Sequence, residues 1–164
     1  MKKVFLALSL LLVGCSTLSQ SPISESSVPL DNYKYVYIPG TSALLSGEGY
    51  TGGTVSTGVY GSSTSKTVNP ADVISGFLMK KGFAKLPQLD SALLGQTLIV
   101  SYGESDRRPI LGGLAGYSIE TTIQFLDAAT NEIVASTTAS GYGDTEADDI
   151  RKAILKSLRS LFEQ

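Results

Sequence analysis

Short runs in which hydrophobic and polar residues alternate dominate the middle of the chain and predict β-strands. Residues 33–38 alternate strictly, with three tyrosines on one face and Val36 and Ile38 on the other. Pro39 and Gly40 then end the run. Four further strands are expected at residues 83–86, 96–102, 117–126 and 132–140. The tight turn at residues 127–131 predicts that the last two strands form an antiparallel hairpin.

Two other segments have the period of a helix. The first is expected to begin at Asn69, an N-cap residue followed by Pro70 at the first helical position, and to end at Gly82. Its apolar residues recur at helical spacing, and they are Val73, Ile74, Phe77 and Leu78.

The second helix is expected after Thr145, which can cap it together with Asp148. Acidic residues occupy its first turn and basic residues follow, as the helix dipole favours. One apolar stripe runs along it, formed by Ile150, Ala153, Ile154, Ser157, Leu158, Leu161 and Phe162.

The element order is therefore β-α-β-β-β-β-α, which predicts an α+β fold in one domain over residues 31–164. We expect a two-layer sandwich, with two helices on a mainly antiparallel sheet of about five strands. The first helix is expected to cross over between two strands, which would make the sheet mixed. Residues 41–68 are rich in Gly, Ser and Tyr, a composition that predicts a long mobile loop. The alternative is an irregular hairpin.

The first residues have the composition of a secretory signal peptide. Lys2 and Lys3 precede an apolar run at residues 4–13, and Leu12-Val13-Gly14-Cys15 follows. This ending resembles the lipobox of bacterial lipoproteins. The resemblance implies cleavage after residue 14, lipid on the thiol of Cys15 and acylation of its new amine. The alternative is an ordinary signal peptide in which the cysteine occurs by chance.

Residues 15–30 are rich in serine, contain Pro22 and Pro29 and predict a flexible tether behind the lipidated cysteine. No later apolar run is long enough to span a bilayer, so the expected attachment to the membrane is the lipid alone. Ser16 stands where lipoprotein sorting rules would place an aspartate for inner-membrane retention. Resemblance to those rules implies an outer-membrane protein that faces the periplasm.

Composition narrows the chemistry. The 164 residues carry a formal net charge of −2, which argues against nucleic acid as a partner. The chain has no histidine and one cysteine, so an intrachain disulfide and a thiolate metal cluster are excluded. No cofactor is expected beyond the covalent lipid on Cys15.

Three groups of residues could suggest catalysis or metal binding, and each has a simpler interpretation. Lys66 near Ser62, Ser63 and Ser65 could form a Ser–Lys dyad, but it lies in the expected mobile loop. Glu104 and Asp106 are spaced like paired carboxylates, yet Arg107 and Arg108 beside them favour local ion pairs. The acidic residues that start the last helix serve its dipole without a metal, and they are Asp144, Glu146, Asp148 and Asp149.

Together, the lipobox, the short tether and the strand and helix motifs resemble small Gram-negative envelope lipoproteins that are known as domains of unknown function. The motifs are Tyr-Lys-Tyr-Val-Tyr at residues 33–37, Lys-Lys-Gly-Phe at 80–83 and Tyr-Ser-Ile-Glu at 117–120. The element order is also similar to that of envelope accessory lipoproteins. These include peptidoglycan-synthase activators, curli-secretion components and the N-terminal domain of the periplasmic Tol translocation protein. This likeness implies a protein-binding role.

Two loops have compositions that are typical of binding surfaces. Tyr50 and Tyr60 lie among glycines, and aromatic rings on a pliable backbone are common in binding sites. Arg107 and Arg108 lie beside Ile110 and Leu111, a mixture found at interaction centres. The alternative is that these side chains fold back onto the sheet.

The sequence thus favours a non-enzymatic, outer-membrane accessory lipoprotein with an envelope protein as partner. A hydrolase that acts on envelope material and a structural component of the cell surface are the alternatives. The sequence predicts no oligomeric state.

Overall fold

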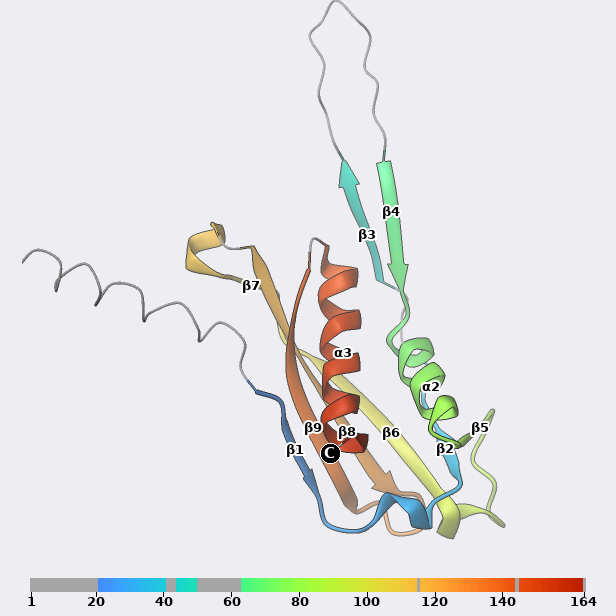
Figure 1. Ribbon diagram of the computed structural model, residues 1–164. Coiled ribbons are helices and arrows are strands. Elements are labelled where there is room, and N and C mark those ends of the chain that lie inside the picture. The colour runs from blue at the N-terminus through green and yellow to red at the C-terminus, as the bar shows by residue number, and fades with distance from the viewer. Residues whose placement is uncertain (1–20, 41–43, 50–62, 115, 144, 164) are drawn as a thin grey trace, which may run out of the picture.

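The computed structural model describes residues 21–40, 44–49, 63–114, 116–143 and 145–163, with the backbone alone at 44–49 and 63–67. Its main sheet has seven strands in the order β1-β9-β8-β6-β2-β5, and β7 pairs with β8 off that path. Figure 1 shows both helices, α2 and α3, on one face of this sheet. The strands are β1 (Ile23–Ser26), β2 (Tyr35–Tyr37), β5 (Ala84–Leu86), β6 (Thr97–Glu104), β7 (Arg108–Pro109), β8 (Tyr117–Asp127) and β9 (Ile133–Tyr142).

Both helices begin at the caps that the sequence predicts. The Asn69 side chain accepts a hydrogen bond of 3.0 Å from the backbone N–H of Ala71, and α2 spans Pro70–Lys80. The Thr145 hydroxyl accepts one of 3.2 Å from the N–H of Asp148, and α3 spans Glu146–Phe162. Each cap satisfies a backbone donor that has no partner inside its own helix.

The sheet is mixed, as the expected crossover requires. Strand β2, next to the edge strand β5, runs parallel to both β5 and β6, whereas β6, β8, β9 and β1 pair antiparallel. The chain leaves β2, forms α2 and returns through β5 at the edge of the sheet. The predicted α+β sandwich is confirmed, although the strand number exceeds the expected five because β1 and β7 lie in segments with no alternating pattern.

The first strand corrects part of the predicted tether. Residues 23–26, expected to be flexible, pair antiparallel with β9, from Ile23 opposite Thr138 to Ser26 opposite Ala135. The Ser27 backbone N–H continues the contact with a 2.8 Å hydrogen bond to the carbonyl of Val134. Backbone hydrogen bonds hold this strand rather than buried side chains, since Ile23 is 67% exposed.

The segment predicted as a mobile loop, residues 41–68, contains a second, two-stranded sheet. Strands β3 (Leu44–Gly49) and β4 (Ser63–Val68) pair antiparallel, with Leu44 opposite Val68 and Gly49 opposite Ser63. The hairpin alternative is therefore correct for these strands. The part of the loop between them, residues 50–62, lies outside the described residues.

The core lies between the sheet and the two helices. Ile154 and Leu158 of α3 are fully buried, as are Ile123 and Phe125 of β8. At the end of α3, the Phe162 ring lies 5.8 to 6.0 Å from the rings of Phe77, Phe83 and Phe125. Among the described residues, no helix is both long enough and apolar enough to cross a bilayer.

Helix α3 approaches β9 so closely that one position has no room for a side chain. A Cβ atom at Gly141 would lie 1.9 Å from the backbone oxygen of Asp149 and 2.6 Å from the backbone nitrogen of Ala153. Glycine at this position therefore sets the distance between the helix and the sheet.

Candidate functional site

The loop between β6 and β8 folds into a defined projection. Strand β7 pairs with the start of β8, so that Arg108 lies opposite Ser118 and Pro109 opposite Tyr117. At the base of the loop tip, the Ile110 N–H donates a 2.9 Å hydrogen bond to the Gly116 carbonyl. In Figure 1 this loop extends beyond the sheet at the end where α3 begins.

The backbone of the loop tip turns sharply through left-handed conformations. Gly112 and Gly113 have φ values of 66° and 96°, which glycine adopts without steric cost. Leu111 also has a positive φ of 49°, which is uncommon for a residue with a side chain. These turns direct apolar side chains into solvent, with Leu114 94% and Leu111 70% exposed.

Two contacts of Arg107 hold the base of the loop. Its Nε donates a 2.9 Å hydrogen bond to Oδ2 of Asp149 on α3, and its guanidinium lies 4.6 Å from the centre of the Tyr117 ring. The Asp149 side chain is fully buried. A charge-assisted bond and a cation–π contact therefore fix the loop to the body of the protein.

Burial raises the pKa of the Asp149 carboxyl above its ordinary value. The hydrogen bond and charge of Arg107 act in the opposite direction, as does the backbone of Gly143, and they offset the burial only in part. Asp149 is thus a structural acid whose charge depends on Arg107.

This arrangement separates the two arginines that the sequence groups together. Arg107 turns toward Asp149 and Tyr117 and supports the loop, with 28% of its side chain exposed, so its part in binding stays a prediction. Arg108 is exposed, as is Leu111, while Ile110 is half-buried at the base. The predicted local pairing of Arg107 with Glu104 and Asp106 is also replaced by the bond to Asp149, and Glu104 accepts the Tyr102 hydroxyl instead.

Several other predicted site residues lie outside the described part of the chain. These are Cys15, Tyr50, Tyr60 and Asp144, and the Lys66 side chain is not described. Within the described residues, no three carboxylates or other metal-ligating side chains are arranged to hold a metal ion.

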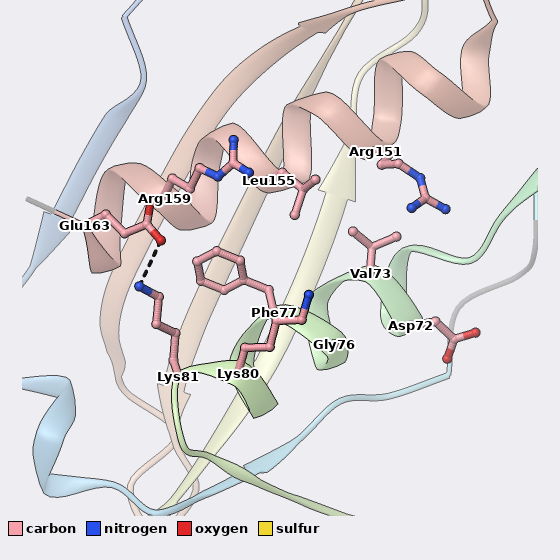
Figure 2. A pocket seen from close by; sticks show the side chains of 10 residues that line it. All are labelled: Asp72, Val73, Gly76, Phe77, Lys80, Lys81, Arg151, Leu155, Arg159 and Glu163. Carbon is pink, nitrogen blue, oxygen red and sulfur yellow. Dashed lines mark ion pairs between the residues drawn. The ribbon is translucent and has the colours of Figure 1, made fainter.

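A groove of about 550 Å³ between α2 and α3 was not predicted from the sequence. Figure 2 shows Leu155 pointing toward α2 and Phe77 toward α3, with charged side chains around them. Lys81 and Glu163 form an ion pair of 2.9 Å across it. The remaining lining residues are Asp72, Val73, Gly76, Lys80, Arg151 and Arg159. The signal in the sequence was the row of basic residues on α3, which can be read as serving the helix dipole alone.

Comparison with known proteins finds a structural likeness only. No protein-family model matches the chain, and no curated protein matches it. Its structure is similar to that of a dodecamer of a PelC variant from Paraburkholderia phytofirmans, with 14% sequence identity and a TM-score of 0.49. The match covers 84% of this chain and 93% of the PelC chain. A likeness of this size gives no basis for assigning a function.

Proposed function

We propose that this protein is a non-enzymatic lipoprotein of the outer membrane that faces the periplasm and binds a protein of the cell envelope. Cys15, at the end of the signal-like segment, supports the lipid anchor. The exposed apolar loop tip on a fixed base supports the binding role, and this single observation carries the proposal.

The loop tip resembles a docking element in its energetics. Leu111 and Leu114 expose apolar surface, and burying this surface against a partner would lower the free energy of the system. The hydrogen bond from Arg107 to Asp149 already orders the loop base, so the loop would lose less conformational entropy when a partner binds. Both features favour a protein partner with an apolar pocket.

The binding role can be tested by photo-crosslinking in intact cells. A photoreactive amino acid in place of Leu114 should give one dominant adduct with an envelope protein. The matched control is the same amino acid at Ile133, which is 51% exposed on β9 and lies outside the loop. The adduct should disappear when Leu111→Ser is added, because the tip then loses its second apolar side chain. Equal adducts from both positions would contradict the loop as the binding site.

The anchor has its own test. Cys15→Ser should abolish metabolic labelling with a fatty acid and release the protein from membranes, because no helix among the described residues could hold it there. Membrane association that resists carbonate washing in this variant would contradict the lipoprotein assignment. Digestion by protease added to intact cells would favour a component of the cell surface over one that faces the periplasm.

A further inference from the structure

The groove between α2 and α3 continues into a second hollow on the other side of Leu155. The second hollow has a volume of about 600 Å³ and shares Leu155, Arg159 and Glu163 with the groove. It adds Lys152 and Lys156 of α3, and Pro22, the residue before β1, also lines it. The outer side of α3 therefore forms one continuous surface with depressions along both edges.

Positive charge is concentrated on this surface. We define the basic helical face as the six basic residues that line the two hollows, Lys80, Lys81, Arg151, Lys152, Lys156 and Arg159. The two hollows contain two acidic residues, Asp72 and Glu163, so their net charge is +4. The whole chain has 13 basic and 15 acidic residues, which leaves seven against thirteen elsewhere, a net charge of −6. Such a separation of charge orients a protein in an electric field or against a charged surface.

Pairing inside the groove neutralises little of this charge. Figure 2 shows one ion pair among the ten residues that line the groove, between Lys81 and Glu163. Arg151 and Arg159 of α3 both line the groove, and neither forms an ion pair with another of the ten residues drawn in Figure 2. Planar guanidinium groups of this kind bind phosphate oxygens through two hydrogen bonds.

The position of β1 brings this face close to the proposed lipid anchor, on which the inference rests. Because β1 begins at Ile23, only seven residues separate Cys15 from the ordered domain. Fully extended, they span at most about 25 Å. The last of them, Pro22, lines the second hollow together with Lys152 and Arg159. The tether therefore leaves the domain beside the basic helical face.

We propose that the basic helical face docks on the anionic phospholipid headgroups of the membrane that holds the lipid anchor. Arg151 and Arg159 would bind lipid phosphates, the lysines would add attraction to the negative surface, and Leu155 would meet the apolar boundary below the headgroups. The bilayer would hold the helices toward the membrane and the opposite face of the sheet away from it.

Fluorescence quenching in reconstituted vesicles tests this orientation. A fluorophore on Lys152→Cys reports on the basic helical face. A matched probe on Ser101→Cys lies on the opposite side of the sheet, since its neighbours Val100 and Tyr102 contact the core. The quencher is a spin label on lipid headgroups, in vesicles of phosphatidylcholine with or without phosphatidylglycerol. Cys15 is the only native cysteine, so its acylation leaves the engineered thiol as the only site for the dye.

With phosphatidylglycerol present, the probe at residue 152 should be quenched several-fold more strongly than the probe at 101. The difference should vanish in 0.5 M salt, at about a 4 Å Debye length, and in neutral vesicles. Arg151→Gln with Arg159→Gln should lower the ratio of docked to undocked protein on the order of tenfold, and the same positions changed to lysine should retain docking.

The outcomes separate the docking surface from the anchor. Flotation of protein with vesicles reports on the anchor, and equal quenching of the two probes on floating protein would overturn the docking. If the wild-type chain takes up the dye, Cys15 is free and the anchor is contradicted. The two probes are then placed in the Cys15→Ser variant and mixed with excess anionic vesicles. Stronger quenching at residue 152 than at residue 101 would still show that the basic helical face docks on the membrane. A residue-152 probe that vesicles do not quench but that is shielded in intact cells would indicate an acidic protein partner, and would overturn the lipid assignment.

Discussion

Arg107 and Asp149 lie 42 positions apart in the chain and meet through a hydrogen bond of 2.9 Å, with the carboxylate fully buried. One residue belongs to an exposed loop and the other to the first turn of α3. This pair converts a glycine-rich connection into a projection with a fixed base.

Arg107→Ala should lower the free energy of unfolding by about 3 kcal/mol, because it leaves a buried carboxylate without its charged partner. Arg108→Ala, at the exposed neighbouring position, should change it by less than about 0.5 kcal/mol. Urea denaturation of both variants checks this difference. Equal losses would show that the bond to Asp149 contributes little to stability.

Tyr33→Phe should destabilise the protein by about 1 kcal/mol at neutral pH, because it removes the 2.8 Å hydrogen bond from the Tyr33 hydroxyl to Asp127. Burial raises the pKa of Asp127, but this bond and the N–H groups of Ala129 and Thr130 outweigh burial and lower it overall. A carboxyl whose pKa is lower in the folded state stabilises the fold when the pH is above its pKa in the unfolded state, near 4. This stabilisation is lost as the pH falls through the pKa of the folded state.

The difference in stability between wild type and Tyr33→Phe should therefore shrink as the pH is lowered from 7 toward 3. Thermal melting across this range measures it, with Tyr35→Phe on the neighbouring strand as the control. At the alkaline end, burial first, and then the bond to and charge of Asp127, raise the pKa of Tyr33 to about 12. The contribution of Tyr33 itself is thus complete below 10 and is lost as the pH rises through about 12. A gap that stays constant from pH 7 to 3 would contradict the role of Asp127.

Gly141→Ala should cost about 3 kcal/mol or more, since its Cβ would meet backbone atoms of α3 that cannot move without shifting the helix. The matched control is Gly103→Ala on β6, where a Cβ would find no atom within 4 Å. Chemical denaturation of the two variants compares them. If both substitutions have the same effect, α3 and β9 are less tightly packed than described.

Ile154→Asp should cost several kcal/mol, about 4 or more, because it places an unpaired charge at a fully buried position of α3. Lys152→Ala, two residues away and exposed, should leave the stability within about 0.5 kcal/mol of wild type. Circular dichroism during heating follows both. An Ile154→Asp protein with the melting temperature of the wild type would mean that α3 does not pack on the sheet.

The sequence predicts the parts of the fold that rest on local patterns. Asn69 and Thr145 cap their helices where expected, and Val36, Leu98 and Ile123 are buried on the faces that alternation assigns to them. Local signals suffice here because each cap or strand face is defined by residues a few positions apart.

The missed features depend on partners far away in the sequence. Ile-Ser-Glu-Ser at residues 23–26 has no alternation long enough to mark a strand, and it becomes one because β9 offers an open edge. The inward direction of Arg107 depends on Asp149, which the sequence places with the other acids of a helix N-terminus. Likewise, the groove between α2 and α3 exists because two helices distant in the chain share one face of the sheet.

The pairing of β1 with β9 also sets an order of assembly. Ile23 must find Thr138, so this contact closes a loop of about 115 residues, and the entropy of such closure makes it a late event. During synthesis, β1 cannot pair until β9, the last strand among the described residues, has been made. Until then the outer edge of β9 is open to strands of other molecules, so the new chain is most prone to aggregation just before β1 docks.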